Sequence, residues 1–171
     1  MHDIGNPPFG HFGEAAIKNW ANQKAKRILQ ETHSELNFVE NDPRLSDICN
    51  FDGNPQGFRI VTRLHSDRDK YGLNLTHSTL LASIKYPNSE KSADSKFKNK
   101  IGIYLSEKEI YEEMCNAHGL NPGKRYFLAY LMELADDICY CLSDIADAFE
   151  KGIVTSKDFK EDFKEIGKKM E

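Results

Sequence analysis

Four ionisable side chains near the start of the sequence are of the types that hold a metal ion and transfer a proton. His2 and Asp3 open the string HDIGNPPFGHFGE, and a second histidine and carboxylate, His11 and Glu14, close it. An imidazole beside a carboxylate suits magnesium or a divalent transition ion. Because consecutive prolines break a helix, we expect a fixed turn that returns the second pair toward the first. That arrangement would place an acid/base group beside a metal-bound water.

A second set of polar side chains is spaced along one predicted helix. Asp136, Tyr140 and Asp144 are four residues apart, so they share a face of the segment LMELADDICYCLSDIADAFEKG. The rest of this helix is largely apolar, which predicts that it is buried on most sides. A carboxylate on a buried helix must be paired or bound to metal, so Asp136 or Asp137 is a candidate metal ligand. A solvated acidic face is the alternative.

Helices must position these residues, because the sequence predicts one all-α domain. Apolar residues recur at helical spacing, and no segment alternates with the period of two that is typical of a strand. We expect N-caps at Asn54 and Thr76 and a capping box formed by Ser106 and Glu109. The predicted helices cover residues 13–31, 43–50, 54–67, 76–87, 106–117, 122–150 and 156–169.

The composition is typical of a soluble globular protein. Of the 171 residues, 39% are apolar and 29% are charged, and the net charge of −4 argues against a broad nucleic-acid-binding surface. No apolar run reaches the roughly 18–20 residues that span a bilayer, and the N-terminus lacks the pattern of a signal peptide. We therefore expect a cytoplasmic protein with no membrane partner. Without a secretory signal the four cysteines do not predict disulfides, and we interpret Cys139 and Cys141 as buried thiols.

One segment, residues 87–102, differs from the rest because it is polar and rich in lysine and serine. Such a composition predicts a mobile loop between helices. The lysines of this loop could contact phosphate groups, and a loop that is simply solvated is the alternative.

Several of these strings together resemble the deoxyguanosinetriphosphate triphosphohydrolases, bacterial dGTPases of the HD phosphohydrolase superfamily. The strings that carry the resemblance are HDIGNPPFGHFGEAAIKNW and LMELADDICYCLSDIADAFEKGIV, while GNPQGFRIVTRL, LNLTHSTLLASIKYP and YLSEKE match in the same order. The resemblance covers nearly the whole chain. It implies an all-helical HD fold in which residues 1–171 are a partial catalytic core, truncated at both ends relative to the family. It also implies a divalent metal ion, such as magnesium or manganese, and hydrolysis of dGTP to deoxyguanosine and tripolyphosphate.

Carried over position by position, the resemblance assigns roles to individual side chains. It implies that His2, Asp3 and Asp136 bind the metal, and that a further histidine upstream, absent from this chain, completes the ligand set. His11 matches the catalytic histidine, and Glu14 matches the acid that works with it. The implied substrate-binding positions are Asn54, Lys85, Tyr140 and Asp144.

The resemblance also has implications for partners. Members of this family form rings of subunits and can be stimulated by single-stranded DNA. The implied partners are therefore dGTP or another deoxynucleoside triphosphate, further copies of the full-length protein, and single-stranded DNA. Two alternatives stay open: a phosphohydrolase with broader deoxynucleotide specificity, and an inactive HD remnant that binds nucleotide, nucleic acid or partner subunits.

Overall fold

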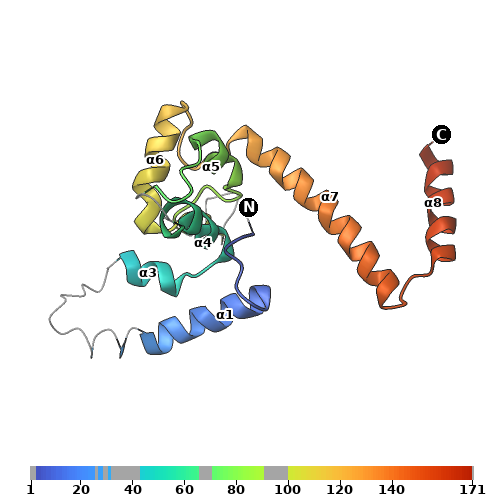
Figure 1. Cartoon of the computed structure of the whole chain (residues 1–171), viewed down its shortest axis with the longest axis horizontal. Coiled ribbons are helices and arrows are strands. Elements are labelled where there is room, and N and C mark those ends of the chain that lie inside the picture. The colour runs from blue at the N-terminus through green and yellow to red at the C-terminus, as the bar shows by residue number, and fades with distance from the viewer. Residues whose placement is uncertain are drawn as a thin grey trace. The chain divides into compact units, whose positions relative to one another are not determined.

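The computed structural model describes residues 3–25, 27–28, 31, 43–65, 71–90 and 100–170. These residues form helices joined by loops, and no strand occurs among them, which confirms the predicted all-α class (Figure 1). The helices are α1 (Gly10–Trp20), α3 (Pro43–Cys49), α4 (Gly53–Arg59), α5 (His77–Ser83), α6 (Lys108–Ala117), α7 (Phe127–Glu150) and α8 (Ser156–Met170). Shorter turns are the π-helical η1 (Ala21–Ala25) and η2 (Ile60–Leu64) and the 3-10 helix η3 (Leu105–Glu107).

The chain divides into two compact units, Met1–Tyr130 and Leu131–Glu171. The first unit contains a hydrophobic core, around which α4, α5 and α6 gather (Figure 1). Because apolar residues recur at helical spacing in these segments, each helix turns one apolar face inward. The core residues are Phe58, Val61, Leu80, Leu81, Ile84, Ile103, Tyr111, Met114 and Cys115.

The start of α4 differs from the prediction by two residues. We expected Asn54 to be the N-cap, but the N-cap is Asp52, whose carboxylate accepts the backbone N–H of Asn54 at 3.1 Å. Aspartate caps a helix as well as asparagine does, so α4 begins directly after Asp52. At α5 the prediction is confirmed, because the Thr76 hydroxyl accepts the N–H of Thr79 at 3.3 Å.

The predicted capping box at Ser106 is wrong. The Ser106 hydroxyl donates instead to Oδ2 of Asp47 at 2.6 Å, and α6 begins only at Lys108 without a side-chain cap. A contact across 59 residues of sequence therefore outweighs the local one. The helix stops before Gly119, whose φ of 60° is in the left-handed region that ends helices.

Other predicted boundaries shift by several residues. Helix α1 begins at residue 10 rather than 13, α5 ends at residue 83 rather than 87, and α7 begins at residue 127 rather than 122. The helix predicted over residues 54–67 is present as α4 and η2, which reaches Leu64. Of the predicted mobile loop, residues 91–99 lie outside the described residues, and residues 87–90 and 100–102 are not helical.

Arg59 is the centre of a buried charge cluster in the first unit. Its guanidinium pairs with Asp47 of α3 and with Glu107 of η3, whose carboxylate lies 2.9 Å from Nη2. The guanidinium carbon also lies 4.2 Å from the centroid of the Tyr104 ring. Burial raises the pKa of Glu107, although the hydrogen bond from Arg59 opposes that rise. The cluster fixes α4 against α3 and the segment before α6.

Helix α7, most of which lies in the second unit, differs from two predictions. The predicted burial on most sides is wrong, because Leu131, Leu134, Ile138 and Leu142 of this helix are 53–65% exposed. The two cysteines predicted to be buried, Cys139 and Cys141, are exposed as well. An apolar helix face is buried only where another element packs on it. Within this unit, Phe159 of α8 touches Phe149 of α7 and Phe163 of α8.

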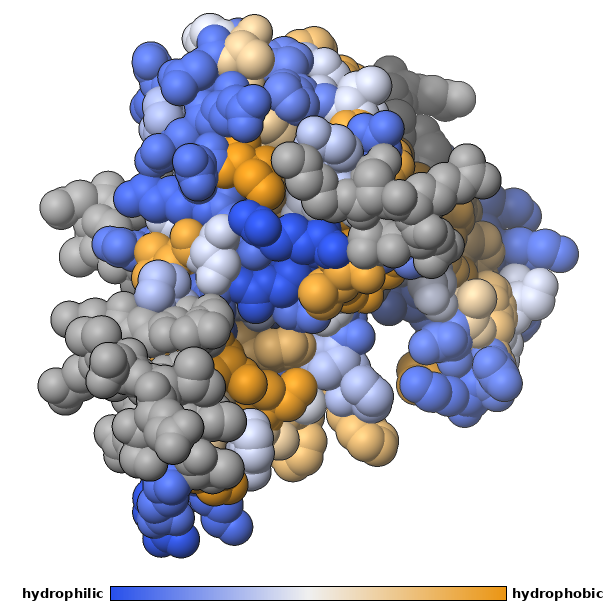
Figure 2. Space-filling model, turned by 60° about the vertical axis from the view of Figure 1, so that its left-hand side comes forward, coloured by the Kyte–Doolittle hydropathy of each residue, from blue (hydrophilic) through white to orange (hydrophobic). Residues whose placement is uncertain are grey.

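Exposed apolar side chains also occur on the first unit. Phe9 and Phe12 are 86% and 80% exposed, and Figure 2 shows apolar residues among hydrophilic ones on one face of the molecule. Among the helices that the structure describes, none combines the length and the apolar character that crossing a membrane requires.

Candidate functional site

The first two residues that the structure brings together are His11 and Glu14. They lie three residues apart on α1, so their side chains share a face, and His11 Nδ1 is 3.0 Å from Glu14 Oε2. The imidazole is 83% exposed, whereas the carboxylate is only 7% exposed. Because Nδ1 faces the carboxylate, Nε2 on the other side of the ring is the nitrogen that can meet a substrate.

Glu14 is held from a second side by α4. Its Oε1 accepts the backbone N–H of Gly53 at 2.8 Å, so both carboxylate oxygens have donors. Burial raises the pKa of Glu14, but hydrogen bonds from His11 and Gly53 and the charge of Lys18 outweigh it, and the pKa lies below its usual value. The carboxylate is therefore ionised at neutral pH and can orient the imidazole.

Asp3 lies in a tight turn that packs on the same end of α4. Asn6 closes this turn by donating its backbone N–H to Asp3 O at 3.1 Å and its side-chain amide to Asp3 Oδ1 at 3.0 Å. A Cβ at Gly5 would collide with the backbone of Gly53 and Gly57, so only glycine allows this close approach. The turn that carries a predicted metal ligand and the carboxylate of Glu14 thus contact the same helical turn.

The predicted metal site itself stays a prediction. Asp3 belongs to the first unit and Asp136 to the second, and His2 lies outside the described residues. Among the residues that the structure describes, no group of three or more histidine, cysteine, aspartate or glutamate side chains could hold a metal ion. The donor chemistry fits a divalent ion, because carboxylates suit magnesium and manganese and imidazole suits divalent transition ions. The Asn6 amide also gives Asp3 the kind of hydrogen-bonded support that ligating carboxylates have.

The remaining predicted positions of the second unit lie on α7. Asp136 is partly exposed, whereas Asp137, Tyr140 and Asp144 are exposed. The helix runs without a break through these residues, so Asp136, Tyr140 and Asp144 share a face as their spacing predicts.

Two predicted substrate-binding residues belong to the first unit. Asn54 follows Gly53 in the first turn of α4, and its side-chain amide donates to Asp52 Oδ1 at 2.9 Å. Asn54 is the neighbour in sequence of Gly53, whose N–H donates to Glu14. Lys85 comes after α5, where its backbone carbonyl accepts Nε of Arg125 at 2.7 Å.

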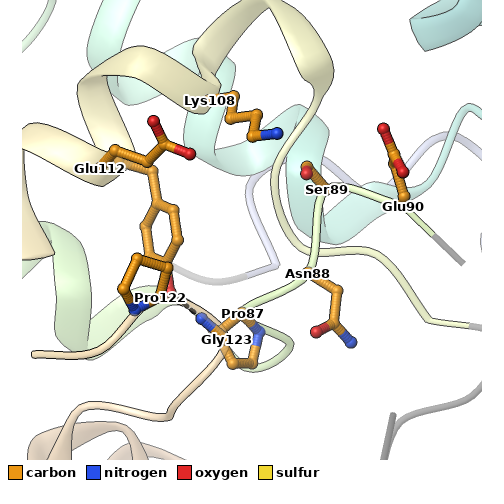
Figure 3. A pocket seen from close by; sticks show the side chains of 9 residues that line it. Pro87, Asn88, Ser89, Glu90, Lys108, Glu112, Pro122 and Gly123 are labelled. Carbon is orange, nitrogen blue, oxygen red and sulfur yellow. Dashed lines mark hydrogen bonds between the residues drawn. The ribbon is translucent and has the colours of Figure 1, made fainter. Parts of the chain in front are cut away.

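Two cavities of the first unit are lined by other residues. One of about 210 Å³ lies among residues 87–90, α6 and the loop before α7. Figure 3 shows Lys108 and Glu112 of α6 beside it, and the Gly123 N–H donates to the Tyr111 hydroxyl at 3.1 Å. A larger one of about 400 Å³ lies among η2, α5 and α6. No predicted site residue within the described chain lines either cavity, and of the acid–base pair only His11 is exposed.

Comparison with known proteins supports the resemblance that the sequence strings suggested. The chain is 38% identical over 169 residues to a deoxyguanosinetriphosphate triphosphohydrolase-like protein of Listeria monocytogenes, a match that covers 97% of the chain. It is 42% identical over 156 residues to a protein of the same description from Pseudomonas aeruginosa, over 87% of the chain. It is 36% identical over 182 residues to a deoxyguanosinetriphosphate triphosphohydrolase of an Enterobacter species, over 92% of the chain.

This chain is homologous to the deoxyguanosinetriphosphate triphosphohydrolases. It spans only 34–36% of the length of these three relatives. No protein-family model matches the sequence.

Some residues that hold the site together were not predicted from the sequence. Gly53, Asn6 and Asp52 hold the predicted side chains in place, and none of them was a candidate. Glycine and asparagine in a loop predict a turn, but they do not indicate which distant residue the turn contacts. The available signal was that Gly53 directly precedes Asn54, and that Gly5 and Asn6 follow Asp3 by two and three residues.

Proposed function

We propose that this chain provides part of the catalytic core of a metal-dependent triphosphohydrolase that converts dGTP to deoxyguanosine and tripolyphosphate. The observation that carries the proposal is the exposed His11 imidazole, which the buried and ionised Glu14 holds at 3.0 Å. An imidazole held by a carboxylate is a proton donor poised for a departing oxygen. Homology to proteins named for dGTP hydrolysis supports the choice of substrate class.

In this proposal His2, Asp3 and Asp136 are ligands of a magnesium or manganese ion. When bound, such an ion polarises a phosphoryl oxygen and lowers the pKa of a coordinated water. The contribution of the chain is to hold the ligands ready. For Asp3 that contribution is the turn closed by Asn6, because the amide at 3.0 Å leaves the carboxylate little rotational freedom.

His11 supplies the proton that the leaving group needs. Breaking the bond between the α-phosphate and the 5′ oxygen leaves negative charge on the nucleoside oxygen, and protonation of that oxygen by the imidazolium removes it. Glu14 stabilises the imidazolium and directs Nδ1 toward itself, so Nε2 faces the substrate. The lowered pKa of Glu14 keeps its negative charge available for this purpose.

The other predicted residues bind the substrate. Lys85 would neutralise phosphate charge as a point cation, and Asn54 would contact the phosphates or the sugar. We assign Tyr140 a flat contact beneath the deoxyribose, where a ribose 2′-hydroxyl would be crowded. Asp144 would add a polar contact to the sugar pocket. Tyr140→Ala should therefore admit GTP, and continued rejection of GTP would count against this assignment.

The proposal is tested by measuring manganese-dependent release of tripolyphosphate from a panel of dGTP, the other deoxynucleoside triphosphates and GTP. The assay is run on this chain and on a longer protein that includes the upstream histidine implied by the family. Release from dGTP alone supports the narrow substrate, and release from the whole panel of deoxynucleotides supports the broader specificity. If the longer protein releases no tripolyphosphate from any nucleotide, the proposed activity is wrong.

A further inference from the structure

The first residue of α4, Gly53, contacts two parts of the proposed catalytic machinery at once. Its N–H donates to Oε1 of Glu14 at 2.8 Å. On the other side, a Cβ at this position would collide with Oδ1 of Asn6 and come within 3.2 Å of Glu14 Oε1. Asn6 in turn donates its amide to Asp3. One backbone residue therefore lies between the proton-donor pair and the turn that carries a proposed metal ligand.

The glycine is not explained by the helix that it begins. Gly53 is the first helical residue after the Asp52 cap, and alanine is more favourable than glycine within a helix. Its φ is not in the left-handed region that requires glycine. The tertiary contact with Asn6 and Glu14 is what leaves no room for a side chain.

The core of the first unit anchors this residue. Asp52, which is 5% exposed, donates its backbone N–H to the hydroxyl of Tyr104 at 3.3 Å. Tyr104 is 1% exposed and lies against the guanidinium of Arg59. Burial raises the pKa of Tyr104, so its hydroxyl stays protonated. The position of the Gly53 N–H is therefore set by the packed core rather than by the open surface near His11.

We propose that Gly53 is a positioning residue, which sets the distance between the His11–Glu14 pair and the Asp3 turn by offering an N–H to one and a bare Cα to the other. This inference rests on the proposed function, because it gives these side chains their catalytic meaning. A displacement of about 1 Å between a proton donor and a reacting centre can lower a rate on the order of 100-fold.

The experiment compares three variants of this chain: Gly53→Ala, Asn6→Ala and the double variant Asn6→Ala/Gly53→Ala. The readout is titration of the Glu14 carboxyl carbon by NMR, which needs no activity. The charged groups that act on Glu14, His11 and Lys18, are unchanged in all three. We expect Gly53→Ala to raise the pKa of Glu14, because the added methyl displaces the N–H donor.

The double variant keeps this test informative. Removing the Asn6 side chain leaves room for the methyl group at residue 53, so the pKa of Glu14 should return toward the wild-type value. Asn6→Ala alone should leave the pKa of Glu14 unchanged. Gly102→Ala is the matched control, since its Cβ would collide with the Tyr86 backbone elsewhere in the same unit. It should strain the fold without moving the titration of Glu14.

Hydrolysis by the longer protein gives the second readout. Gly53→Ala should lower kcat about 100-fold with little change in KM. If Gly53→Ala leaves the titration of Glu14 unchanged, or Gly102→Ala changes it equally, the positioning role is wrong whatever the activity. If the titrations behave as expected but no nucleotide is hydrolysed, the proposed function fails and the geometric coupling stands.

Discussion

The two units of this protein surround their polar side chains differently. In the first, the side chain of Glu14 is 7% exposed and has donors from its own helix and from α4. In the second, Tyr140 of α7 is 55% exposed on a helix that carries its polar residues at equally regular spacing. Helical spacing alone therefore aligns side chains, whereas only packing by a distant segment holds them in one place.

The largest effect expected from this difference is on activity. His11→Ala in the longer protein should lower kcat for dGTP on the order of 1,000-fold, because the departing oxygen loses its proton donor. His65→Ala, which removes another exposed histidine of the first unit, is the matched control and should stay close to wild type. Tripolyphosphate release in the presence of manganese measures both. Equal losses of kcat in the two variants would show that His11 is not the proton donor.

A comparable effect on stability is expected from the buried charge cluster. Arg59→Leu leaves Asp47 and Glu107 without their shared cation, and removal of one partner of a buried ion pair costs about 3–5 kcal/mol. In the second unit, Lys151→Ala breaks an exposed pair with Asp147 and should change stability by about 0.5 kcal/mol or less. Urea unfolding of both variants measures the contrast. A small loss for Arg59→Leu would show that the cluster is no more important than a surface pair.

A smaller effect is expected from acid. The pKa of Glu14 is lowered in the folded protein, so its stabilising contribution is present above the pKa of an unfolded glutamate. The contribution is lost as pH falls through the lower folded value. Glu14→Gln should therefore unfold more easily than wild type at neutral pH, and the difference should shrink as pH falls below about 4. Unfolding free energies measured between pH 7 and pH 3 test this, and a difference that grows toward low pH would contradict the lowered pKa.

The mildest test concerns the cysteines. Cys139 and Cys141 of α7 are exposed, whereas Cys115 of α6 is buried and burial raises its pKa. A thiol reagent at neutral pH should label the two α7 cysteines within the mixing time and Cys115 only on unfolding. Equal protection of all three would show that the exposed face of α7 is covered in solution.

Much of the local structure was predictable, because it depends on residues close together in sequence. The Thr76 cap and the start of α8, where Thr155 and Asp158 form reciprocal hydrogen bonds, follow from short-range patterns. The contact between His11 and Glu14 is equally local, but the helix predicted to begin at residue 13 left His11 outside it. Such features need no knowledge of the rest of the chain.

Errors occurred where a local pattern competed with a distant partner. Ser106 and Glu109 match a capping box, yet the hydroxyl of Ser106 bonds to Asp47. The α7 pattern predicted burial, yet the described chain leaves its apolar residues exposed, since amphipathic spacing does not say whether a partner surface is present.

The sequence by itself determined the all-α class and most of the helices, because helical periodicity and caps act over three or four residues. The tertiary structure decided that Glu14 is buried and ionised, and that the turn carrying Asp3 packs on the same helix α4. The donor to Glu14 Oε1 is the N–H of Gly53, which lies 39 residues beyond Glu14. A backbone N–H has no sequence signature, so only the tertiary contact between Gly53 and Glu14 could assign it to that carboxylate.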